Sequence, residues 1–253
     1  NRSVISKILP KVLRFSHHRS NLAVIFQNGE DKFLFRKHHI IREEQAYMIK
    51  GSGVNLQQFC YTPEPENGKI RVLLPARIII EKGIFILTDA AIKLKEKYRD
   101  KVQFLLCGGL DDNPKAIKEE DLKRVCDGEY IQWLGYRTDV LSLLKDCHIV
   151  AFPSYYKEGL PKSLIEATAV GRPIITTDSV GCKETVIEGY NRYLIPVQDS
   201  ETLADRLEIL IEDKALRQKM GKNSRCLAEK DFSIENVIAK HLEIYEILMT
   251  GNL

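Results

Sequence analysis

The stretch that decides the fold is PSYYKEGLPKSLIE, residues 153–166, because it joins an apolar run to a helical pattern. The apolar run, residues 148–152, is typical of a buried strand. Gly159 lets the backbone come close to a ligand. Pro161 suits the first turn of a helix, where its missing N–H costs nothing. Because a helix N-terminus carries free N–H groups and a partial positive charge, the stretch predicts a phosphate-binding site.

Working outward from this stretch, short apolar runs alternate with amphipathic ones. Runs rich in Ile, Val and Leu predict strands buried on both faces, at residues 71–76, 102–107, 130–134, 148–152, 173–176 and 192–195. Apolar residues three and four apart predict helices at residues 84–98, 114–126, 140–145 and 160–170. Such alternation predicts an α/β fold, with a Rossmann-like, doubly wound parallel sheet and helices on both faces. Ligands of such sheets bind at the carboxyl ends of the strands.

The two ends of the chain differ from this central pattern. Residues 1–60 predict a basic helix, a strand at 22–26, a short helix and a strand at 46–50, which is an incomplete second α/β unit. Gly and Pro residues within 51–68 indicate a linker. We therefore predict an amino-terminal part at 1–62, a Rossmann-like domain at 63–230 and a final helix at 231–253. Ser200 and Ser233 are expected to cap the last helices.

Composition excludes several classes of protein. The net charge is +3, and acidic residues are interleaved with basic ones almost everywhere, which does not favour a nucleic-acid binder. Residues 1–20 are the exception, with five Lys or Arg and no acid, so this segment is either a solvated helix face or a contact with anionic lipid. No apolar run reaches the roughly 20 residues of a membrane span. The six cysteines form no C-x-x-C pair, so we expect no zinc site and a reducing, cytoplasmic location.

Two carboxylates, Glu158 and Glu166, flank the start of the helix in the opening stretch. They would repel a phosphate, but an ionised carboxylate accepts two hydrogen bonds from neighbouring hydroxyls. A ligand with hydroxyls at both ends and phosphates between them is a nucleotide sugar. The alternative is two surface glutamates that lie eight residues apart by chance.

Two further loops carry candidate residues. Arg77 and Lys82-Gly83 follow the predicted strand 71–76, where cations can neutralise a diphosphate leaving group. The loop Gly135-Tyr136-Arg137 follows the predicted strand 130–134 and could contact a base. The alternatives are solvated loop charges for the first loop and an ordinary strand-end turn for the second.

Together these motifs resemble glycosyltransferase family 4. The ordered set that carries the resemblance is Arg77, Lys82-Gly83, Gly108-Gly109, Gly135-Tyr136, Pro153-Ser154, Glu158-Gly159-Leu160-Pro161, Glu166-Ala167, Gly171-x-Pro173 and Gly181-x-x-Glu184. The resemblance covers about residues 20–250. It implies a GT-B fold, in which two Rossmann-like domains face each other across a cleft. One departure is Arg192, at a position that is often Gly in the family.

The resemblance implies a role for each candidate residue. Arg77 and Lys82 hold the donor diphosphate, and Glu158 contacts hydroxyls of the donor sugar. The backbone of Gly159-Leu160-Pro161 lies near the sugar and the phosphates. Glu166 binds the ribose hydroxyls, and the loop Gly135–Arg137 frames the base. No metal or other cofactor is expected.

The resemblance also implies an activity and partners. It predicts a retaining hexosyltransferase that moves a sugar from a UDP- or GDP-linked donor to a bacterial cell-surface polysaccharide or lipid-linked glycan. Residues 1–62 then correspond to the tail of an acceptor-binding domain, and the final helix returns toward it. Peripheral contact with the inner face of the plasma membrane is expected through residues 1–20. No nucleic-acid partner is expected.

Rival functions remain open at this point. A nucleotide-sugar epimerase could use the same architecture but would need its own acid and base. A dinucleotide oxidoreductase is disfavoured, since the loop after residues 71–76 lacks G-x-G-x-x-G. The non-enzyme alternative is a nucleotide-binding module without turnover.

Overall fold

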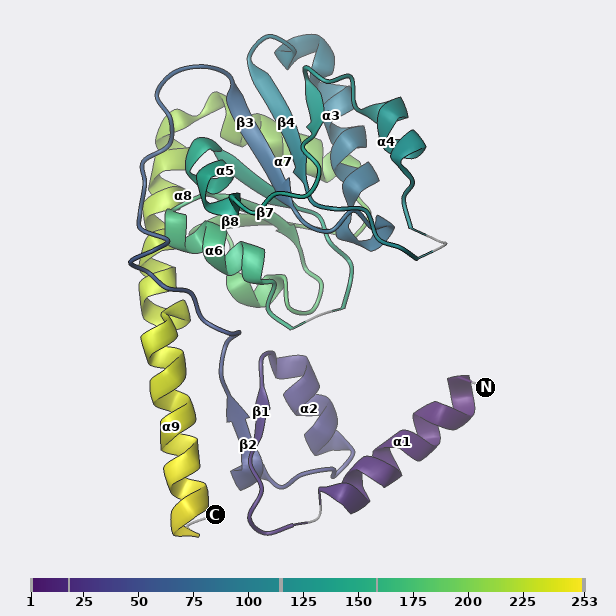
Figure 1. Ribbon diagram of the computed structural model, residues 1–253, viewed down its shortest axis with the longest axis vertical. Helices are drawn as coiled ribbons and strands as arrows, with labels where there is room; N and C mark the ends of the chain where they lie inside the picture. Colours follow the sequence, from purple (N-terminus) through teal and green to yellow (C-terminus); the bar gives the residue numbers. More distant parts are fainter. Residues whose placement is uncertain (1, 18, 114–115, 158, 252–253) are drawn as a thin grey trace.

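The computed structural model describes residues 2–17, 19–113, 116–157 and 159–251. Its strands form two parallel sheets, one of six strands and one of two. Figure 1 shows the six-stranded sheet and its helices at one end of the molecule and the two-stranded unit at the other. The fold is therefore α/β, as the alternating pattern predicts.

The large sheet has the order β5-β4-β3-β6-β7-β8, and every neighbouring pair is parallel. Its strands are β3 (Ile70–Pro75), β4 (Val102–Cys107), β5 (Ile131–Trp133), β6 (Ile149–Phe152), β7 (Ile174–Thr177) and β8 (Arg192–Ile195). All six predicted strands are confirmed to within two residues at either end. Arg192, the departure from the family pattern, lies buried at the first position of β8.

Helices cover both faces of this sheet (Figure 1). The helices are α3 (Ile84–Tyr98), α4 (Glu119–Val125), α5 (Val140–Asp146), α6 (Lys162–Val170), α7 (Ser200–Glu212) and α8 (Lys214–Leu227). Leu74 of β3 belongs to a core that includes α3 and α7, whereas Leu73 belongs to a core that includes α5 and α6. Successive side chains of one strand thus enter opposite cores, which explains why these strands are apolar throughout.

The strand order defines the position at which a ligand can enter. β4 and β5 lie on one side of β3, whereas β6, β7 and β8 lie on the other. The chain therefore reverses its direction of growth between β3 and β6. In open α/β sheets the loops on either side of such a switch point diverge and leave a crevice at the carboxyl ends of the strands.

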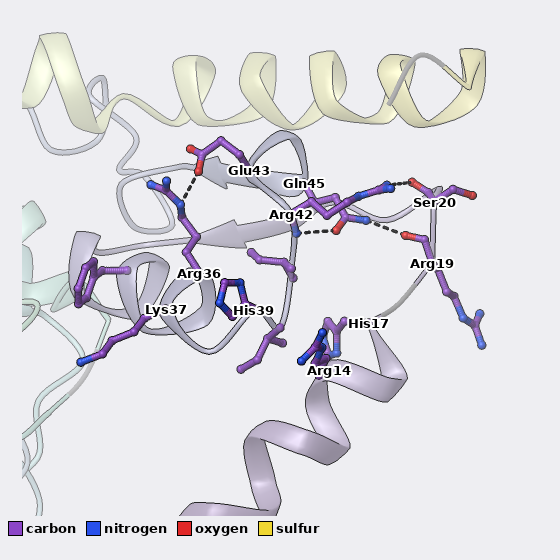
Figure 2. Close-up of a pocket in the computed structure, with 13 residues that line it drawn as sticks. Arg14, His17, Arg19, Ser20, Arg36, Lys37, His39, Arg42, Glu43 and Gln45 are labelled. Carbon is purple, nitrogen blue, oxygen red and sulfur yellow. Dashed lines mark hydrogen bonds and ion pairs between the residues drawn. The ribbon is translucent and has the colours of Figure 1, made fainter.

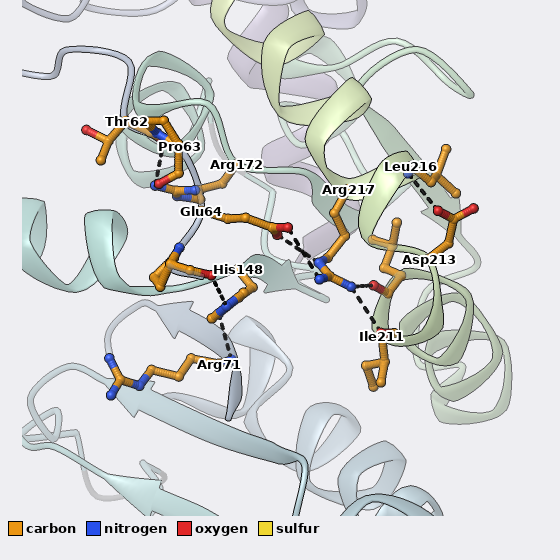
Figure 3. A network of polar contacts seen from close by, with 12 residues as sticks. Thr62, Pro63, Glu64, Arg71, His148, Arg172, Ile211, Asp213, Leu216 and Arg217 are labelled. Carbon is orange, nitrogen blue, oxygen red and sulfur yellow. Dashed lines mark hydrogen bonds and ion pairs between the residues drawn. The ribbon is translucent and has the colours of Figure 1, made fainter. Parts of the chain in front are cut away.

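A buried polar network fixes the linker that enters the large sheet (Figure 3). Arg217 and Glu64 form an ion pair with 2.8 Å between Nε and Oε2, and both side chains are 5% exposed. Arg172 donates to the carbonyl oxygens of Thr62 (2.8 Å) and Leu144 (2.7 Å). These bonds tie residues 62–64 to helices distant in sequence, so the linker is part of the folded core.

The small sheet pairs β1 (Val24–Phe26) with β2 (Ala46–Met48), and α2 (Gly29–Lys37) connects them. Helix α1 (Arg2–Ser16) precedes the sheet. After α8, a π-helical turn (Ala228–Phe232) leads into α9 (Ile234–Thr250), which runs beside the small sheet (Figure 1). Val237 and Ile244 of α9 form a core with Ile49, against which residues of both small strands pack. The division at residues 62 and 230 stays a prediction.

Three local predictions need correction. The predicted helix 114–126 is shorter, and α4 begins only at Glu119; residues 114 and 115 lie outside the described residues. Asp199 rather than Ser200 caps α7, because its carboxylate accepts from the Thr202 N–H and leaves Ser200 as the first helical residue. Pro161 is the N-cap of α6 rather than a residue of its first turn. The predicted cap at Ser233 is confirmed, since its hydroxyl accepts from the Asn236 N–H at 3.1 Å.

Candidate functional site

The loop after β3 supplies a buried cation to the crevice at the switch point. Lys82 ends the short 3₁₀ helix Ile80–Lys82 and is only 6% exposed. Its Nζ lies 5.2 Å from the ring centroid of Phe152 and 5.3 Å from that of Tyr156. Interpretation of Lys82 as a solvated loop charge is therefore wrong. A lysine held over two aromatic rings is attracted to their faces and has a restricted position.

The loop after β6 is bound tightly to the loop after β3. The Tyr155 N–H and the Ser154 hydroxyl both donate to the Glu81 carbonyl oxygen, at 2.9 and 3.2 Å. Gly83 has φ of +79°, and a Cβ there would lie 2.2 Å from the Pro153 carbonyl oxygen. Only glycine allows this approach, because the backbone is left-handed and the space is filled. The two loops thus form one rigid wall of the crevice.

Helix α6 presents its N-terminus at the same edge of the sheet. Its N-cap, Pro161, has no side chain that could accept from the first turn. The N–H group of Leu160, just before the helix, donates to the side-chain oxygen of Gln27 at 3.2 Å. Glu158, the predicted sugar-binding carboxylate, lies outside the described residues. The helix start therefore offers backbone donors that no side chain of α6 itself satisfies.

Glu166 lies on the second turn of α6, with its side chain 14% exposed. Burial raises the pKa of this carboxyl, and Lys162, with Nζ 3.9 Å from Oε1, partly opposes that increase. An acceptor-only group held partly out of water is costly unless it is paired with donors. Glu166 is thus suited to accept hydrogen bonds from a bound hydroxyl-bearing ligand.

The loops after β4 and β5 form the other end of the site. The Gly108 N–H donates to the Gly135 carbonyl at 3.0 Å, which brings the two loops together. Tyr136 is 78% exposed and so presents a free ring face. Arg137 binds Asp139 through two hydrogen bonds, at 2.6 and 2.7 Å. These residues form an exposed surface at the carboxyl end of β5, and contact of the loop Gly135–Arg137 with a base stays a prediction.

Arg77 differs from Lys82 in its surroundings. Its side chain is 63% exposed, and its Nη1 lies 3.1 Å from Asp111 Oδ2 in the loop after β4. An exposed pair of this kind contributes little to stability and can exchange partners. The structure therefore brings Lys82 to the loop between β6 and α6, at Tyr156, and pairs Arg77 with the loop after β4.

Sequence reasoning missed two residues of this site. Tyr156 lies inside the stretch of residues 153–166, and an aromatic residue two positions before Glu158 in the sequence is a usable signal. Gln27 gave no signal, because it contacts the loop before α6 across 133 residues of sequence.

A separate cavity of about 920 Å³ lies in the small unit and includes none of the predicted donor residues (Figure 2). It lies between the end of α1, α2 and the turn before β2. Its basic lining residues are Arg14, His17, Arg19, Arg36, Lys37, His39 and Arg42. Glu43 is its one acidic lining residue among those described, and it pairs with Arg36.

Within residues 2–17, 19–113, 116–157 and 159–251, His, Cys, Asp and Glu side chains form no group of three or more suited to a metal ion. In the same parts of the chain, none of the helices combines the length and apolar character that a membrane crossing requires.

The switch point, the buried lysine and the helix start lie at the carboxyl edge of an α/β sheet, and comparison with known proteins identifies the family. Residues 62–226 match the family described as glycosyl transferases group 1. The match covers well over half of the chain, which therefore belongs to this family.

Two individual glycosyltransferases illustrate this similarity. An α-1,3-N-acetylgalactosaminyltransferase of Campylobacter jejuni, which acts on N,N'-diacetylbacillosaminyl-diphospho-undecaprenol, is 31% identical over 97% of this chain. The chain spans only 64% of that relative's length. The carboxy-terminal domain of a group 1 glycosyl transferase from Francisella tularensis is 27% identical, with a TM-score of 0.62, and covers 72% of this chain and all of that one.

A third comparison extends to both sheets. The structure of Anabaena Alr3699/HepE in complex with UDP has a TM-score of 0.77 at 22% identity, over 92% of this chain and 68% of that one. At this identity the likeness concerns the fold alone. The structural neighbours are GT-B glycosyltransferases, in agreement with the parallel six-stranded sheet of this chain.

Proposed function

We propose that this chain binds the donor of a retaining glycosyltransferase that uses a UDP- or GDP-linked sugar. The observation that carries the proposal is the position of Lys82 over Phe152 and Tyr156, at the switch point of the sheet and against the loop that leads into α6. A positive charge and the backbone N–H groups of a helix start at one edge favour a diphosphate. Glu166 then accepts from ribose hydroxyls, and Gly135, Tyr136 and Arg137 frame the base.

The proposed reaction gives a role to each of the remaining candidate residues. In the proposed enzyme, Glu158 holds hydroxyls of the transferred sugar, and the backbone at Gly159-Leu160-Pro161 lies beside its diphosphate. Lys82 and Arg77 neutralise the charge that develops as the nucleoside diphosphate leaves. This arrangement replaces a divalent metal, so we propose that no metal is needed. The family 4 resemblance supports these roles, and the complex of HepE with UDP supports a UDP-linked donor.

We further propose that the acceptor is a polysaccharide or a lipid-linked glycan. The Campylobacter relative, whose name specifies a diphospho-undecaprenol acceptor, supports this class. Contact with the membrane is assigned to α1 and the basic cavity of Figure 2. On α1, Val12 and Phe15 are 57% and 89% exposed beside Lys11 and Arg14, and such a combination favours an anionic lipid surface. Sedimentation with anionic but not with neutral vesicles tests this contact.

The donor assignment is tested by ligand binding. Purified chain is mixed with UDP, GDP, UDP-glucose, GDP-mannose, ATP and NAD, with and without EDTA, and its thermal midpoint is measured. A ligand present at 100 times its Kd stabilises the native state by about 2.7 kcal/mol. We expect a clear increase in the thermal midpoint with either UDP or GDP and with the matching nucleotide sugar. EDTA should leave this increase unchanged. Stabilisation by NAD alone, or only in the presence of a metal, contradicts the proposal.

A further inference from the structure

The contact between Gln27 and Leu160 joins the small unit to the proposed donor site. Gln27 directly follows β1, and its side-chain oxygen accepts from the Leu160 N–H at 3.2 Å. Leu160 belongs to the backbone that, under the proposed function, lies beside the donor sugar and diphosphate. A side chain of the small unit thus occupies the Leu160 N–H, a hydrogen-bond donor that the nucleotide sugar needs.

Gly159 makes room for this oxygen. A Cβ built on Gly159 would lie 2.1 Å from Gln27 Oε1, so the oxygen rests in the space that any other residue would fill. The site therefore accommodates an oxygen atom against a backbone N–H at the entrance to a helix. This is the environment that oxygen atoms of a phosphate or a sugar require.

The main chain of Gln27 is held firmly, whereas its side chain is not. On one side, the Ile49 N–H donates to the Phe26 carbonyl at 3.0 Å. On the other, Asn28 is 1% exposed and caps α2 by accepting from the Asp31 N–H at 2.8 Å. The Gln27 side chain is exposed, so its 3.2 Å bond exchanges readily with water or with a ligand.

We propose that Gln27 is a placeholder in the donor site. Its amide oxygen takes the position of a donor oxygen on the Leu160 N–H, and the incoming nucleotide sugar displaces it. The inference rests on the proposed function, because it requires that the donor reaches Leu160. Donor binding then breaks one of the contacts between the small unit and α6, so that occupancy of the site is coupled to the position of the small unit.

The placeholder predicts an unusual direction of change. Gln27→Ala removes the competing oxygen, so the donor no longer has to break a hydrogen bond in order to bind. Since such a bond has a modest net strength, we expect affinity for the nucleoside diphosphate to rise about two- to tenfold. Gln27→Glu should lower affinity below that of the wild type, because a carboxylate binds the N–H more strongly and repels phosphate.

Lys50→Met is the matched control. Lys50 lies two residues beyond the end of β2, at the same edge of the small sheet, and its Nζ pairs with Asp231 at 2.8 Å. This pair also joins the small unit to the rest of the chain, but it leaves the Leu160 N–H covered. We therefore expect no gain in affinity from Lys50→Met, which separates removal of the placeholder from general loosening of the two units.

The experiment uses calorimetry on the 253-residue chain with UDP, GDP, UDP-glucose and GDP-mannose. Amide exchange at Leu160, followed by NMR without ligand, should be faster in Gln27→Ala and should slow again when the nucleotide is added. Tighter binding in Gln27→Ala together with weaker binding in Gln27→Glu supports the inference. Binding that is unchanged or weaker in Gln27→Ala overturns it and leaves the proposed function standing. If neither the wild type nor the variant binds any of the four ligands, the proposed function fails and the inference fails with it.

Discussion

Replacement of Glu166 by glutamine should affect binding and stability in opposite directions. The side chain is 14% exposed, and burial raises its pKa. In the proposed complex the carboxylate accepts from ribose hydroxyls, and hydrogen bonds to a charged group contribute about 1.5–3 kcal/mol. Loss of the whole side chain in Glu166→Ala should therefore weaken nucleotide binding roughly ten- to hundredfold. Glu166→Gln keeps a neutral hydrogen-bond acceptor and should lose less affinity for the nucleotide than Glu166→Ala.

The effect on stability follows from the sign of the pKa shift. Because the folded-state pKa lies above the ordinary value of 4.5, the folded protein binds a proton at Glu166 more tightly than the unfolded chain does. Protonated Glu166 thus favours the fold at low pH, and this contribution is lost as the pH rises through the folded-state pKa. At neutral pH, Glu166→Gln removes the burial of a charge, so the free energy of unfolding should stay the same or rise.

Calorimetry and urea denaturation measure the two effects, with Glu96→Gln on an exposed turn of α3 as the control. Binding has its own pH dependence, because the ionised carboxylate accepts hydrogen bonds with both oxygens and more strongly than the protonated acid does. Because the pKa of Glu166 is raised, acidification should begin to weaken nucleotide binding at a higher pH than it would with a glutamate of ordinary pKa. Glu166→Gln should remove this pH dependence. A folded Glu166→Ala protein with wild-type affinity for UDP and GDP would refute the assignment.

Two further predictions concern the scaffold of the site. Glu64→Gln should lower the free energy of unfolding by about 3 kcal/mol, because it leaves the buried Arg217 guanidinium without its anionic partner. Exposed Glu66→Gln should change the free energy of unfolding little, and equal effects in urea denaturation would contradict this account. Gly83→Ala should cost more stability than Gly68→Ala. Both have positive φ and so share a strain of about 1–2 kcal/mol, but only at Gly83 would the new Cβ meet a carbonyl oxygen, whereas around Gly68 there is open space. Equal losses of thermal stability would show that this close approach is unimportant.

Local patterns were sufficient for most of the secondary structure. β4, β8 and α3 have the predicted limits, because an apolar strand or an amphipathic helix of ordinary length carries its periodicity in its own residues. The order of strands and helices also predicts the parallel sheet, since parallel strands require crossovers, and most of the crossovers here contain an α-helix. Local sequence did not predict the N-cap of α7 correctly. Asp199 and Ser200 both have side chains that can cap a helix, and only the path of the backbone decides which of them is the N-cap.

The motif around residues 153–166 predicted a ligand site because a strand, a glycine-containing loop and a helix follow one another directly in sequence. Its chemistry could not be completed from sequence. Lys82 has the same local signal as a solvated lysine, and its burial over Phe152 and Tyr156 depends on β3 and β6 being neighbours in the sheet. The contact of Gln27 with Leu160 depends on the position of one unit relative to another. Periodicity and turn chemistry act over a few residues, so the sequence by itself determined most of the elements and their order. Burial and long-range hydrogen bonds arise only when distant segments pack, so the tertiary structure alone decided which side chains meet there.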